Sequence, residues 1–594
     1  LCVANQKPER AEVDTTSLDE KLCRFIVSAN LPFSIVENQE FIELLHSLRP
    51  RIQVPYRRKV IEQLREMKRT VDNDIQRRLV DQHVSITTDG WTSSNNDTYM
   101  SFTCSFITSD FKLEALTLEC RKHEGNTAGE DLAAAVRAMI ERHGLKGRVL
   151  ALTTDCEPSM VKTGRILAEG DGPTHIGCAC HRLESVTSKA FNGPGVSKAL
   201  ALARGLVARY TMSSQACDRL KQMCEICEIT SLKPIQDVVT RFWSTHAFVV
   251  RLLYLRRPIA EHERIDRIPP MLEEKDWEVL VLVEPLLKPF MEAQKHLEAS
   301  KTVTGSLVIG YIADLRDDLD AAVINLKSTF GAAAGTAKAS AKADVLRCAE
   351  ALKADFGHRW GNGTDVLTEM EGPRRQPKAF KKLQVLSTAM DPRSKSLYGI
   401  DEMDHPEVWD AVAAAAVEIG LAAESAPTDV GGGSGAPIAV DSAPIAVASA
   451  HRPHRRGFAA AAAAHAQVGG AVTEPTGSKR QMESIVNREL EAFKTTPGID
   501  MSKIGKDGKL VLGDPLQWWG IKAREYPMLA ALARRVLCIP ASQAQSERVF
   551  SAAGQIVSPT RSRLDPEHVE LMVFLRTVMP EVDKWNGKGK KRKA

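Results

Sequence analysis

The residues of this sequence that are best placed for chemistry are two aspartates, Asp89 and Asp155. Each ends an apolar segment after a Thr-Thr pair, and each is followed by a turn or a helix start. Carboxylates at two strand ends could share a divalent metal ion, and Mg²⁺ binds one or two carboxylates together with substrate phosphate. Taken singly, either aspartate is more typical of a turn or a helix N-cap. The pair therefore indicates phosphoryl transfer only with support from elsewhere in the chain.

A third carboxylate, Glu547, lies far downstream in a predicted helix. Ser542 and Gln545 have the spacing of a capping box, and Gly554 is suited to end the helix that they begin. Glu547 and Phe550 then share one face of that helix. By propensity alone, Glu547 is a solvent-facing acid that complements the helix dipole. A catalytic role for it requires that the fold bring it back to the two aspartates.

The region around the aspartates has the pattern of a mixed sheet with helices against it. Segments rich in β-branched and aromatic residues predict three antiparallel strands, at 84–88, 99–108 and 112–123. A helix over 131–143 and a strand over 148–154 follow, which gives the order βββαβ. Residues 175–180 could supply a short fifth strand.

Helices dominate the rest of the chain. A capping box of Ser17 and Glu20 predicts a helix over 17–30, which Pro32 ends. A second helix is predicted after Pro55, and its apolar stripe consists of Val60, Leu64, Met67, Val71 and Ile75. Beyond the predicted sheet, nearly everything up to a low-complexity segment has helical periodicity.

That low-complexity segment divides the C-terminal part from the rest. It is rich in Gly, Ala, Pro and Ser, which cannot bury enough apolar surface to offset chain entropy, so we expect a disordered linker. Order returns over 482–493, and Trp518 and Trp519 are predicted core or interface aromatics. The predicted division of the chain is an N-terminal helical domain at 1–80, the first part of the core at 81–190, an all-helical insertion at 191–425, the linker at 426–478, a final block at 479–580 and a basic tail at 581–594.

Composition and charge indicate a protein that works inside the cell. Over 594 residues the formal charge is +4, and no apolar run approaches the roughly 20 residues of a membrane span or forms a secretory signal. The 12 cysteines lack the dense spacing of a disulfide scaffold, so reduced thiols are expected. Basic residues cluster at 57–59, 452–456 and 588–593, and the last cluster is typical of a nuclear-localisation signal, a phosphate-binding patch or a disordered solubilising end. Because the chain begins at Leu1, we expect a fragment.

Cysteines and histidines offer two spacings that could suit zinc. Cys178 and His181, with Cys180 between them, form one, and Cys224 and Cys227 form the other. The second pair lies in a helical stretch, where ordinary semi-buried thiols are the simpler interpretation. We therefore expect thiols there rather than zinc ligands.

Several motifs together resemble the hAT superfamily of DNA transposases, the Ac/Hobo/Tam3-like group associated with BED fingers. The block at 540–575, with Ser-Glu-Arg-Val-Phe-Ser-Ala-Ala-Gly at 546–554 and Arg-Ser-Arg-Leu at 561–564, is similar to the family's C-terminal dimerisation block. The segments at 88–93 and 154–161 resemble its first and second catalytic aspartate motifs. Further matches extend the resemblance over most of the chain, at 31–33, 178–181 (the family's Cys-x-x-His element), 240–241 and 391–393.

The resemblance implies an α/β RNase H-like core, a mixed sheet of βββαβ order interrupted by a large all-α insertion, beside an N-terminal helical unit. It implies that Asp89, Asp155 and Glu547 bind two Mg²⁺ or Mn²⁺ ions, with Glu547 returning to the core after the insertion. The implied activity is cleavage at transposon ends and joining of the freed 3′-hydroxyl to target DNA. Self-association, DNA as the partner and a nuclear location are implied as well, and neither a membrane nor a small-molecule substrate is expected.

Two departures from the family pattern bear on DNA binding. No finger-like set of paired Cys and His precedes Ser17, whereas the family commonly begins with a BED zinc finger. After Arg241 the family's usual Trp is replaced by Phe242, with Trp243 next. Family members stack that ring on a base flipped out during cleavage, and either ring could do so here. Arg241, Phe242, Trp243 and His181 are thus the predicted DNA-binding residues.

Catalysis and association are separate expectations. Besides an active transposase, the sequence leaves open a domesticated descendant that acts as a dimerising DNA-associated regulator without catalysis, and a defective remnant. We also expect the block at 516–576 to pair with the insertion or with a second subunit. The apolar side chains predicted to do so include Val549, Phe550, Leu571, Val573 and Phe574.

Overall fold

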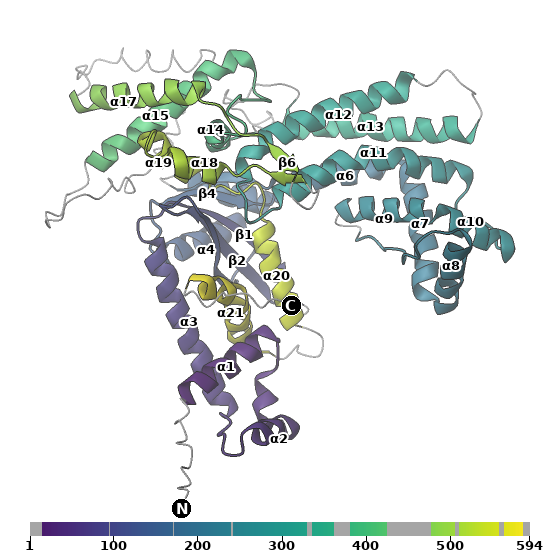
Figure 1. The fold of residues 1–594 in the computed structure, drawn as a ribbon, viewed down its shortest axis with the longest axis horizontal. Helices are drawn as coiled ribbons and strands as arrows, with labels where there is room; N and C mark the ends of the chain where they lie inside the picture. Colours follow the sequence, from purple (N-terminus) through teal and green to yellow (C-terminus); the bar gives the residue numbers. More distant parts are fainter. Residues whose placement is uncertain are drawn as a thin grey trace, which may run out of the picture.

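The computed structural model describes residues 15–93, 95–169, 172–238, 242–328, 336–361, 380–424, 477–504, 510–557 and 564–585. A twisted sheet lies at the centre of the molecule, with helices against it and further helices extending from it (Figure 1). The predicted linker lies outside the described residues, except that a helix already begins at Gly477. The basic clusters at 452–456 and in the tail also lie outside them.

The sheet has five strands in the order β3-β2-β1-β4-β5. Strands β1, β2 and β3 are antiparallel neighbours, whereas β4 runs parallel to β1, and β5 parallel to β4. The bounds are Val84–Thr92 (β1), Thr98–Ile107 (β2), Leu113–Lys122 (β3), Val149–Thr154 (β4) and Thr174–Gly177 (β5). The prediction of a mixed sheet with three antiparallel strands, a helix and a further strand is confirmed.

The fifth strand is shorter than the sequence predicted. β5 ends at Gly177, and helix α6 (Ala179–Phe191) begins directly after Cys178. The Cys178 amide donates to the Thr154 carbonyl at 2.7 Å, so the chain is tied to the end of β4 at the point where it leaves the sheet. The prediction of a strand through 178–180 was wrong because these residues cap and begin a helix.

The N-terminal part is helical, as predicted. It consists of α1 (Thr15–Ser28), the short 3₁₀ helix η1 (Phe33–Glu37), α2 (Gln39–Leu48) and α3 (Arg57–Leu79). The predicted stripe of α3 is buried at Val60, Leu64, Val71 and Ile75, while Met67 is only half-buried. Two more helices, α4 (Gly129–Arg142) and α5 (Pro158–Ala168), connect the strands of the sheet.

A long helical stretch follows the sheet. Its part up to residue 360 forms an extended arm on one side of the molecule, whereas its last helix lies on the other side (Figure 1). The helices of this stretch are α7 (Pro194–Met212), α8 (Ser214–Ile226), α9 (Phe242–Tyr254), α10 (Arg256–Ile265), α11 (Glu274–Leu297), η2 (Gly305–Leu307), α12 (Val308–Ser328), α13 (Ala337–Trp360), α14 (Lys382–Met390), η4 (Glu402–Asp404) and α15 (His405–Glu424). Within the described parts of the chain, no helix is long and apolar enough to span a membrane.

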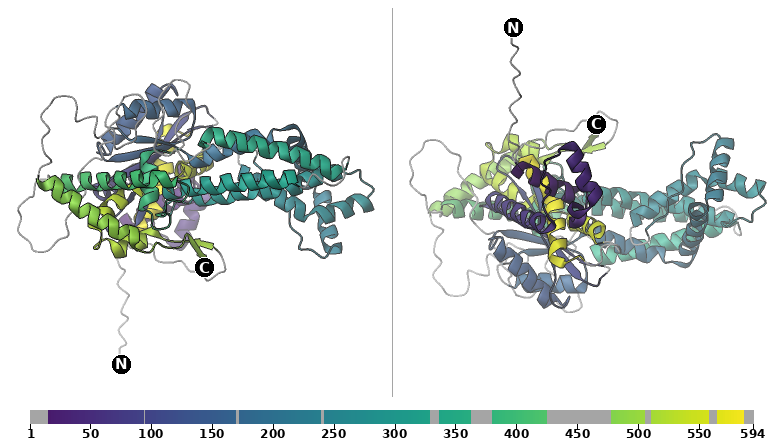
Figure 2. Two further views of the ribbon diagram at one scale, coloured as in Figure 1. Left: turned by 90° about the horizontal axis from the view of Figure 1, so that it is seen from above. Right: turned by 90° about the horizontal axis from the view of Figure 1, so that it is seen from below.

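The C-terminal segment returns to the sheet after the helical stretch. It comprises α17 (Gly477–Thr495), a hairpin of β6 (Ser502–Ile504) and β7 (Leu510–Leu512), α18 (Pro515–Lys522), α19 (Pro527–Val536), α20 (Ala544–Ile556) and α21 (Pro566–Trp585). Seen from below, α21 lies among the N-terminal helices (Figure 2). Two ion pairs fix it there, Arg24 to Asp583 at 2.8 Å and Arg65 to Glu567 at 2.9 Å.

The apolar faces of α20 and α21 are used inside the chain. Val549, Phe550, Leu571, Val573 and Phe574 are all buried in one cluster with the sheet and the N-terminal helices. The prediction that these five side chains join a second subunit or the helical stretch was wrong. The same block does contact the helical stretch through α19, which packs against α14 and α15. The sheet and α3 need a cover for their apolar surface, and α20 and α21 supply it.

The aromatic pair at 518–519 has the predicted role in the core. Trp519 is fully buried, and its indole nitrogen donates to the Met390 carbonyl at 2.8 Å. Its ring stacks on Phe493 with centroids 5.4 Å apart, and the half-buried Trp518 lies edge-on at 5.0 Å. These rings join α17 and α18 to the end of α14.

A fully buried ion pair also fixes the helical stretch to the C-terminal segment. The side chains of Asp391 and Arg393 both have 0% exposure. Arg393 donates to the Val303 carbonyl at 2.9 Å and to the Gly513 carbonyl at 3.2 Å, while Ser306 donates to Asp391 at 2.6 Å. Every charge in this site has a partner, as burial requires.

Candidate active site

The strand register places the two aspartates close together on the neighbouring inner strands β1 and β4. Thr87 of β1 lies opposite Thr153 of β4 in the parallel pair. Asp89 and Asp155 each follow two residues later, so they lie side by side where β4 ends. The expectation that the first strand stops at Asp89 was wrong, because β1 continues to Thr92 and Asp89 pairs with Ser101 of β2. Asp89 accepts a bond from the next amide at 2.9 Å, and Asp155 accepts one from the Glu157 amide at 3.1 Å. Asp155 thus also closes a turn, which leaves its other oxygen available.

Helix α20 meets the same face of β1. The buried Ser546 hydroxyl lies 2.8 Å from the Thr87 hydroxyl, and Gln545 accepts a bond from Thr103 of β2 at 3.3 Å. Alternate residues of a strand share a face, so Thr87 and Asp89 point to the same side of the sheet. The residue after Ser546 is Glu547, and the first turn of α20 therefore carries it toward the aspartates.

The predicted capping box of α20 was wrong. The helix is capped by Gln543 without a side-chain bond, and it runs past Gly554 to Ile556. Ser542 instead donates to the Leu297 carbonyl at 3.1 Å, and Gln545 contacts β2. Both side chains are used for tertiary contacts, which sequence spacing does not reveal.

The electrostatics show that the three carboxylates lie within reach of one another. Burial, together with the charges of Asp155 and Glu547, raises the pKa of Asp89 to about 7. Burial also raises the pKa of Asp155. Like charges at close range disfavour ionisation. The region around Asp89 and the end of β4 is therefore a site of concentrated negative charge.

His181 joins this site from the first turn of α6. Its Nδ1 lies 3.9 Å from a carboxylate oxygen of Glu547 and 3.4 Å from the sulfur of the buried Cys178. Burial opposes the charge of His181, yet the bond to Cys178 and the charges of Cys178 and Glu547 raise its pKa to about 10. The predicted DNA-binding histidine thus supplies positive charge beside Glu547.

The donor chemistry fits a hard divalent cation. Mg²⁺ and Mn²⁺ prefer carboxylate oxygens, and Asp89, Asp155 and Glu547 supply them from separate elements. Among the described residues, no set of three or more His, Cys, Asp or Glu is already arranged around one metal position. Cys224 and Cys227 are buried thiols at the end of α8, and burial raises the pKa of Cys224, in agreement with the simpler interpretation.

The predicted base-stacking residues lie at the start of α9. Phe242 and Trp243 form its first turn, and their side chains are outside what the structure describes, as is Arg241 altogether. Helix α9 packs against α11 in the helical arm. Stacking by either ring stays a prediction.

A row of hydroxyls that was not predicted from the sequence joins the sheet to the C-terminal segment. Ser85, Thr87 and Ser105 are buried on one face of β1 and β2. Besides the bond between Thr87 and Ser546, Ser105 donates to the Cys538 carbonyl at 2.7 Å. Alternating Ser and Thr in otherwise apolar strands was the available signal, since buried hydroxyls need partners.

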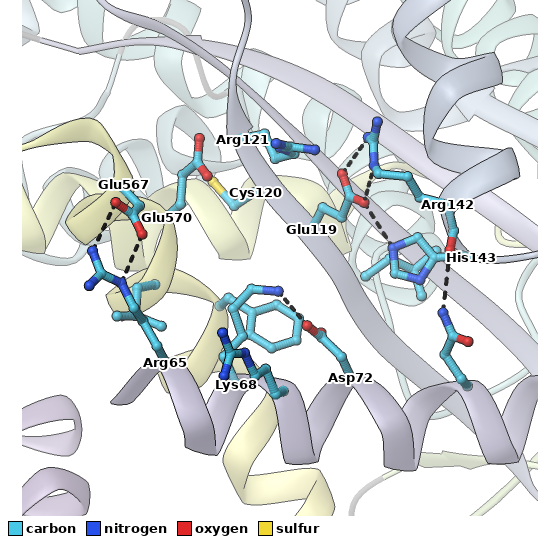
Figure 3. A pocket seen from close by; sticks show the side chains of 15 residues that line it. Arg65, Lys68, Asp72, Glu119, Cys120, Arg121, Arg142, His143, Glu567 and Glu570 are labelled. Atoms are coloured by element: carbon cyan, nitrogen blue, oxygen red, sulfur yellow. Dashed lines mark hydrogen bonds and ion pairs between the residues drawn. The ribbon is translucent and has the colours of Figure 1, made fainter. Parts of the chain in front are cut away.

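A separate cavity of about 460 Å³ lies at the edge strand β3, against α3 and α21 (Figure 3). Its carboxylates are paired. Glu119 accepts from Arg142 at 2.7 Å and lies 2.9 Å from His143, and Glu567 pairs with Arg65. These pairs join four elements across the cavity, and we assign them a structural role.

Comparisons with known proteins agree with this architecture. A family model described as the hAT family C-terminal dimerisation region matches residues 489–579, and one described as the ZBED1 RNase-like domain matches residues 87–170. The second match contains both aspartates, and the first contains Glu547. In both parts that carry the candidate carboxylates, the chain is therefore similar to hAT-family transposases and their relatives.

Relatives that match half of the chain or more carry several kinds of name. The chain is 23% identical to the "Putative AC transposase" of Zea mays, over 96% of this chain and 67% of that protein. It is 22% identical to the human "Zinc finger BED domain-containing protein 4", over 92% of this chain and 42% of that protein. It is also 22% identical to the "Putative transcriptional regulator tpeD" of Talaromyces stipitatus, over 50% of this chain and 40% of that protein.

Proposed function

We propose that this chain is a hAT-type DNA transposase that cleaves and joins DNA strands with Asp89, Asp155 and Glu547. One observation carries the proposal: the contact between Thr87 and Ser546 at 2.8 Å brings Glu547 back to the strand of Asp89. Burial and the charges of Asp155 and Glu547 raise the pKa of Asp89 to about 7. Carboxylates with strongly perturbed pKa values are typical of catalytic sites. The hAT family and its RNase-like domain supply the reaction class in which three such carboxylates act.

The three carboxylates would hold two Mg²⁺ or Mn²⁺ ions. When bound, such ions activate an attacking water and stabilise the leaving oxygen of a phosphodiester. Asp89 and Asp155 would hold them from the sheet, and Glu547 would close the site from α20. His181 would restrain the Glu547 carboxylate and orient it toward the aspartates.

We further propose that the sheet, α20 and α21 form one RNase H-like core and that the helices from α7 to α15 interrupt it. The hydroxyl contacts between β1, β2 and the C-terminal segment support this view, because they join parts that the helical stretch separates in sequence. We propose that the chain works on nuclear DNA as a dimer or larger assembly. The match to the family's dimerisation region supports self-association.

A second candidate function is DNA-associated regulation without catalysis. The relatives named as a zinc finger BED protein and as a transcriptional regulator favour it. Such a protein would keep DNA binding through Lys and Arg contacts to phosphate and would not depend on the three carboxylates. All three carboxylates are present in this chain, which favours the transposase.

The test measures nicking of labelled DNA with Mn²⁺, alongside Mn²⁺ affinity by calorimetry. Asp89→Asn, Asp155→Asn and Glu547→Gln should each remove nicking and weaken Mn²⁺ binding while the fold is kept. Asp110→Asn is the matched control, because Asp110 lies on an exposed turn of the same sheet. Nicking that persists in all three variants would refute the catalytic assignment, and DNA binding without any nicking by the wild type would favour the regulator.

A further inference from the structure

A basic cleft whose lining includes Cys156, the residue after Asp155, lies between the sheet and the helical arm. Its volume is about 790 Å³. Strand β5 and helix α5 form one wall, and helices α6 and α13 form the other. Because β5 is the edge strand, this cleft lies where the sheet ends and the arm begins.

The side chains that line the cleft carry an excess of positive charge. Arg182, Lys189, Arg359 and Lys381 face a single carboxylate, Asp355. Asp355 binds Lys189 at 2.6 Å and Arg359 at 2.7 Å, so one negative charge is shared between two of the four cations. Among the described residues that line the cleft, cations therefore outnumber carboxylates. Solvent-exposed cations around a concave surface concentrate anionic ligands there.

Arg182 is held across the floor of the cleft. Its guanidinium lies over the Trp360 ring, with its carbon 4.7 Å from the ring centre. On the other side, a Cβ at Gly177 would lie 3.3 Å from the Arg182 Nη2 and 3.0 Å from the Cys156 sulfur. Glycine at the end of β5 thus leaves room for the guanidinium. The field of this cation reaches the half-buried His175, because burial and the charges of Lys381 and Arg182 lower the pKa of His175 to about 4.

The lining also indicates which part of a ligand would be bound. Apart from the cations, the exposed wall of α13 presents Ala351 and Ala354, and the described lining includes no Phe, Tyr or Trp ring. The rings in the described lining are the imidazoles of His175 and His358, so bases would find little surface to stack on, whereas phosphates would find guanidinium and ammonium groups. Contacts of this kind give affinity without sequence preference.

We propose that this cleft binds the phosphate backbone of the nucleic-acid strand that passes through the candidate active site. The inference rests on the proposed function, because it takes Asp155 as the start of the path. It adds a specific binding surface, formed by α6, α13 and the end of β5, that is separate from the three carboxylates. It also assigns a role to the junction between the sheet and the helical arm.

The test uses the full chain in EDTA, so that cleavage plays no part in the readout. Binding of a short single strand of random sequence is followed by fluorescence anisotropy at about 50 and 200 mM salt. Raising the salt concentration from the lower to the higher value weakens binding of the wild type. A variant that lacks one phosphate contact should lose about threefold less affinity over the same interval. Lys189→Gln should show this change, and Ala354→Glu should weaken binding at least about threefold at the lower salt concentration.

Matched controls separate the cleft from general surface charge. Ala321→Glu introduces the same charge at an exposed alanine of α12, and Lys221→Gln removes an exposed lysine of α8, both outside the cleft. If Lys189→Gln and Ala354→Glu bind as tightly as the wild type and these controls, the proposal that the cleft binds phosphate is refuted, even if nicking is observed. Weakened binding in both cleft variants together with a wild type that never nicks DNA would instead support the cleft and refute the enzymatic proposal.

Discussion

The hydroxyls of Thr87 and Ser546 lie 2.8 Å apart, although 459 positions separate them in the chain. Thr87 belongs to the strand that carries Asp89, and Ser546 directly precedes Glu547. Both hydroxyls are buried, and Thr87 also contacts Thr103 at 2.6 Å. This contact therefore sets the distance between the two ends of the candidate triad.

Ser546→Ala should loosen the first turn of α20 from the sheet. We expect a loss of about 1 kcal/mol in the free energy of unfolding, because one buried hydrogen bond is removed while Thr87 keeps its bond to Thr103. Urea denaturation measures the loss. Ser551→Ala on the exposed side of the same helix is the control and should change stability by less than about 0.5 kcal/mol. Equal losses in the two variants would mean that the contact does not hold the helix.

Asp89→Asn should stabilise the protein in the absence of divalent metal. The folded state raises the pKa of Asp89 from 3.8 to about 7, so ionisation costs stability as the pH rises through this interval. Full linkage would give about 4 kcal/mol above pH 7, and we expect roughly 2 kcal/mol because the site is partly open to solvent. Thermal unfolding in EDTA at pH 8 tests this. A variant less stable than the wild type there would show that Asp89 is not under repulsion.

The sheet and its two aspartates were predictable because their signals are local. Apolar runs, turn residues and the Thr-Thr-Asp repeat define β1 and β4 without any knowledge of the fold. The pairing of Glu547 with His181 was not predictable, since it depends on how α20 and α6 pack. Ser542 shows the same limit, because its spacing suits a cap while its hydroxyl is used by the Leu297 carbonyl.

The error about the apolar side chains of α20 and α21 has a similar cause. An apolar stripe on a helix indicates that one face of the helix is covered. The stripe of α21 does not reveal whether a second subunit or the chain's own sheet covers it. In the structure, Leu571, Val573 and Phe574 are covered by the sheet and the N-terminal helices. The basic cleft was also beyond sequence analysis, since Lys189 and Arg359 come from helices far apart in the chain.

Arg393→Leu should be among the most destabilising single changes outside the candidate active site. It would leave the Asp391 carboxylate buried with 0% exposure and without its cation, which costs about 3–5 kcal/mol. Arg219→Leu is the control, because Arg219 and Asp266 form a pair that is about one third exposed and contributes at most about 1 kcal/mol. Chemical denaturation compares the two. Similar losses would contradict the view that the pair clamps the C-terminal segment.

Stability should fall in acid through Glu119. The structure lowers the pKa of Glu119 from 4.5 to about 2, because bonds to His143 and Arg142 outweigh the cost of burial. A lowered carboxylate pKa stabilises the fold above pH 4.5, and this contribution is lost as the pH falls from 4.5 toward 2. We expect about 2–3 kcal/mol from this group. Glu119→Gln should flatten the pH dependence of unfolding in that range, and an unchanged slope would contradict it.

Self-association should depend on exposed rather than buried residues of the dimerisation region. Phe550 is 7% exposed and packs on Trp91, so Phe550→Ala should cost about 3–5 kcal/mol of folding stability. Ile521 of α18 is 73% exposed and lies in the matched region at 489–579, so Ile521→Asp should leave unfolding unchanged and weaken association. Light scattering of both variants, with denaturation curves, separates the two effects. If Ile521→Asp keeps the wild-type mass while Phe550→Ala dissociates without loss of stability, the apolar face of α20 forms the interface after all.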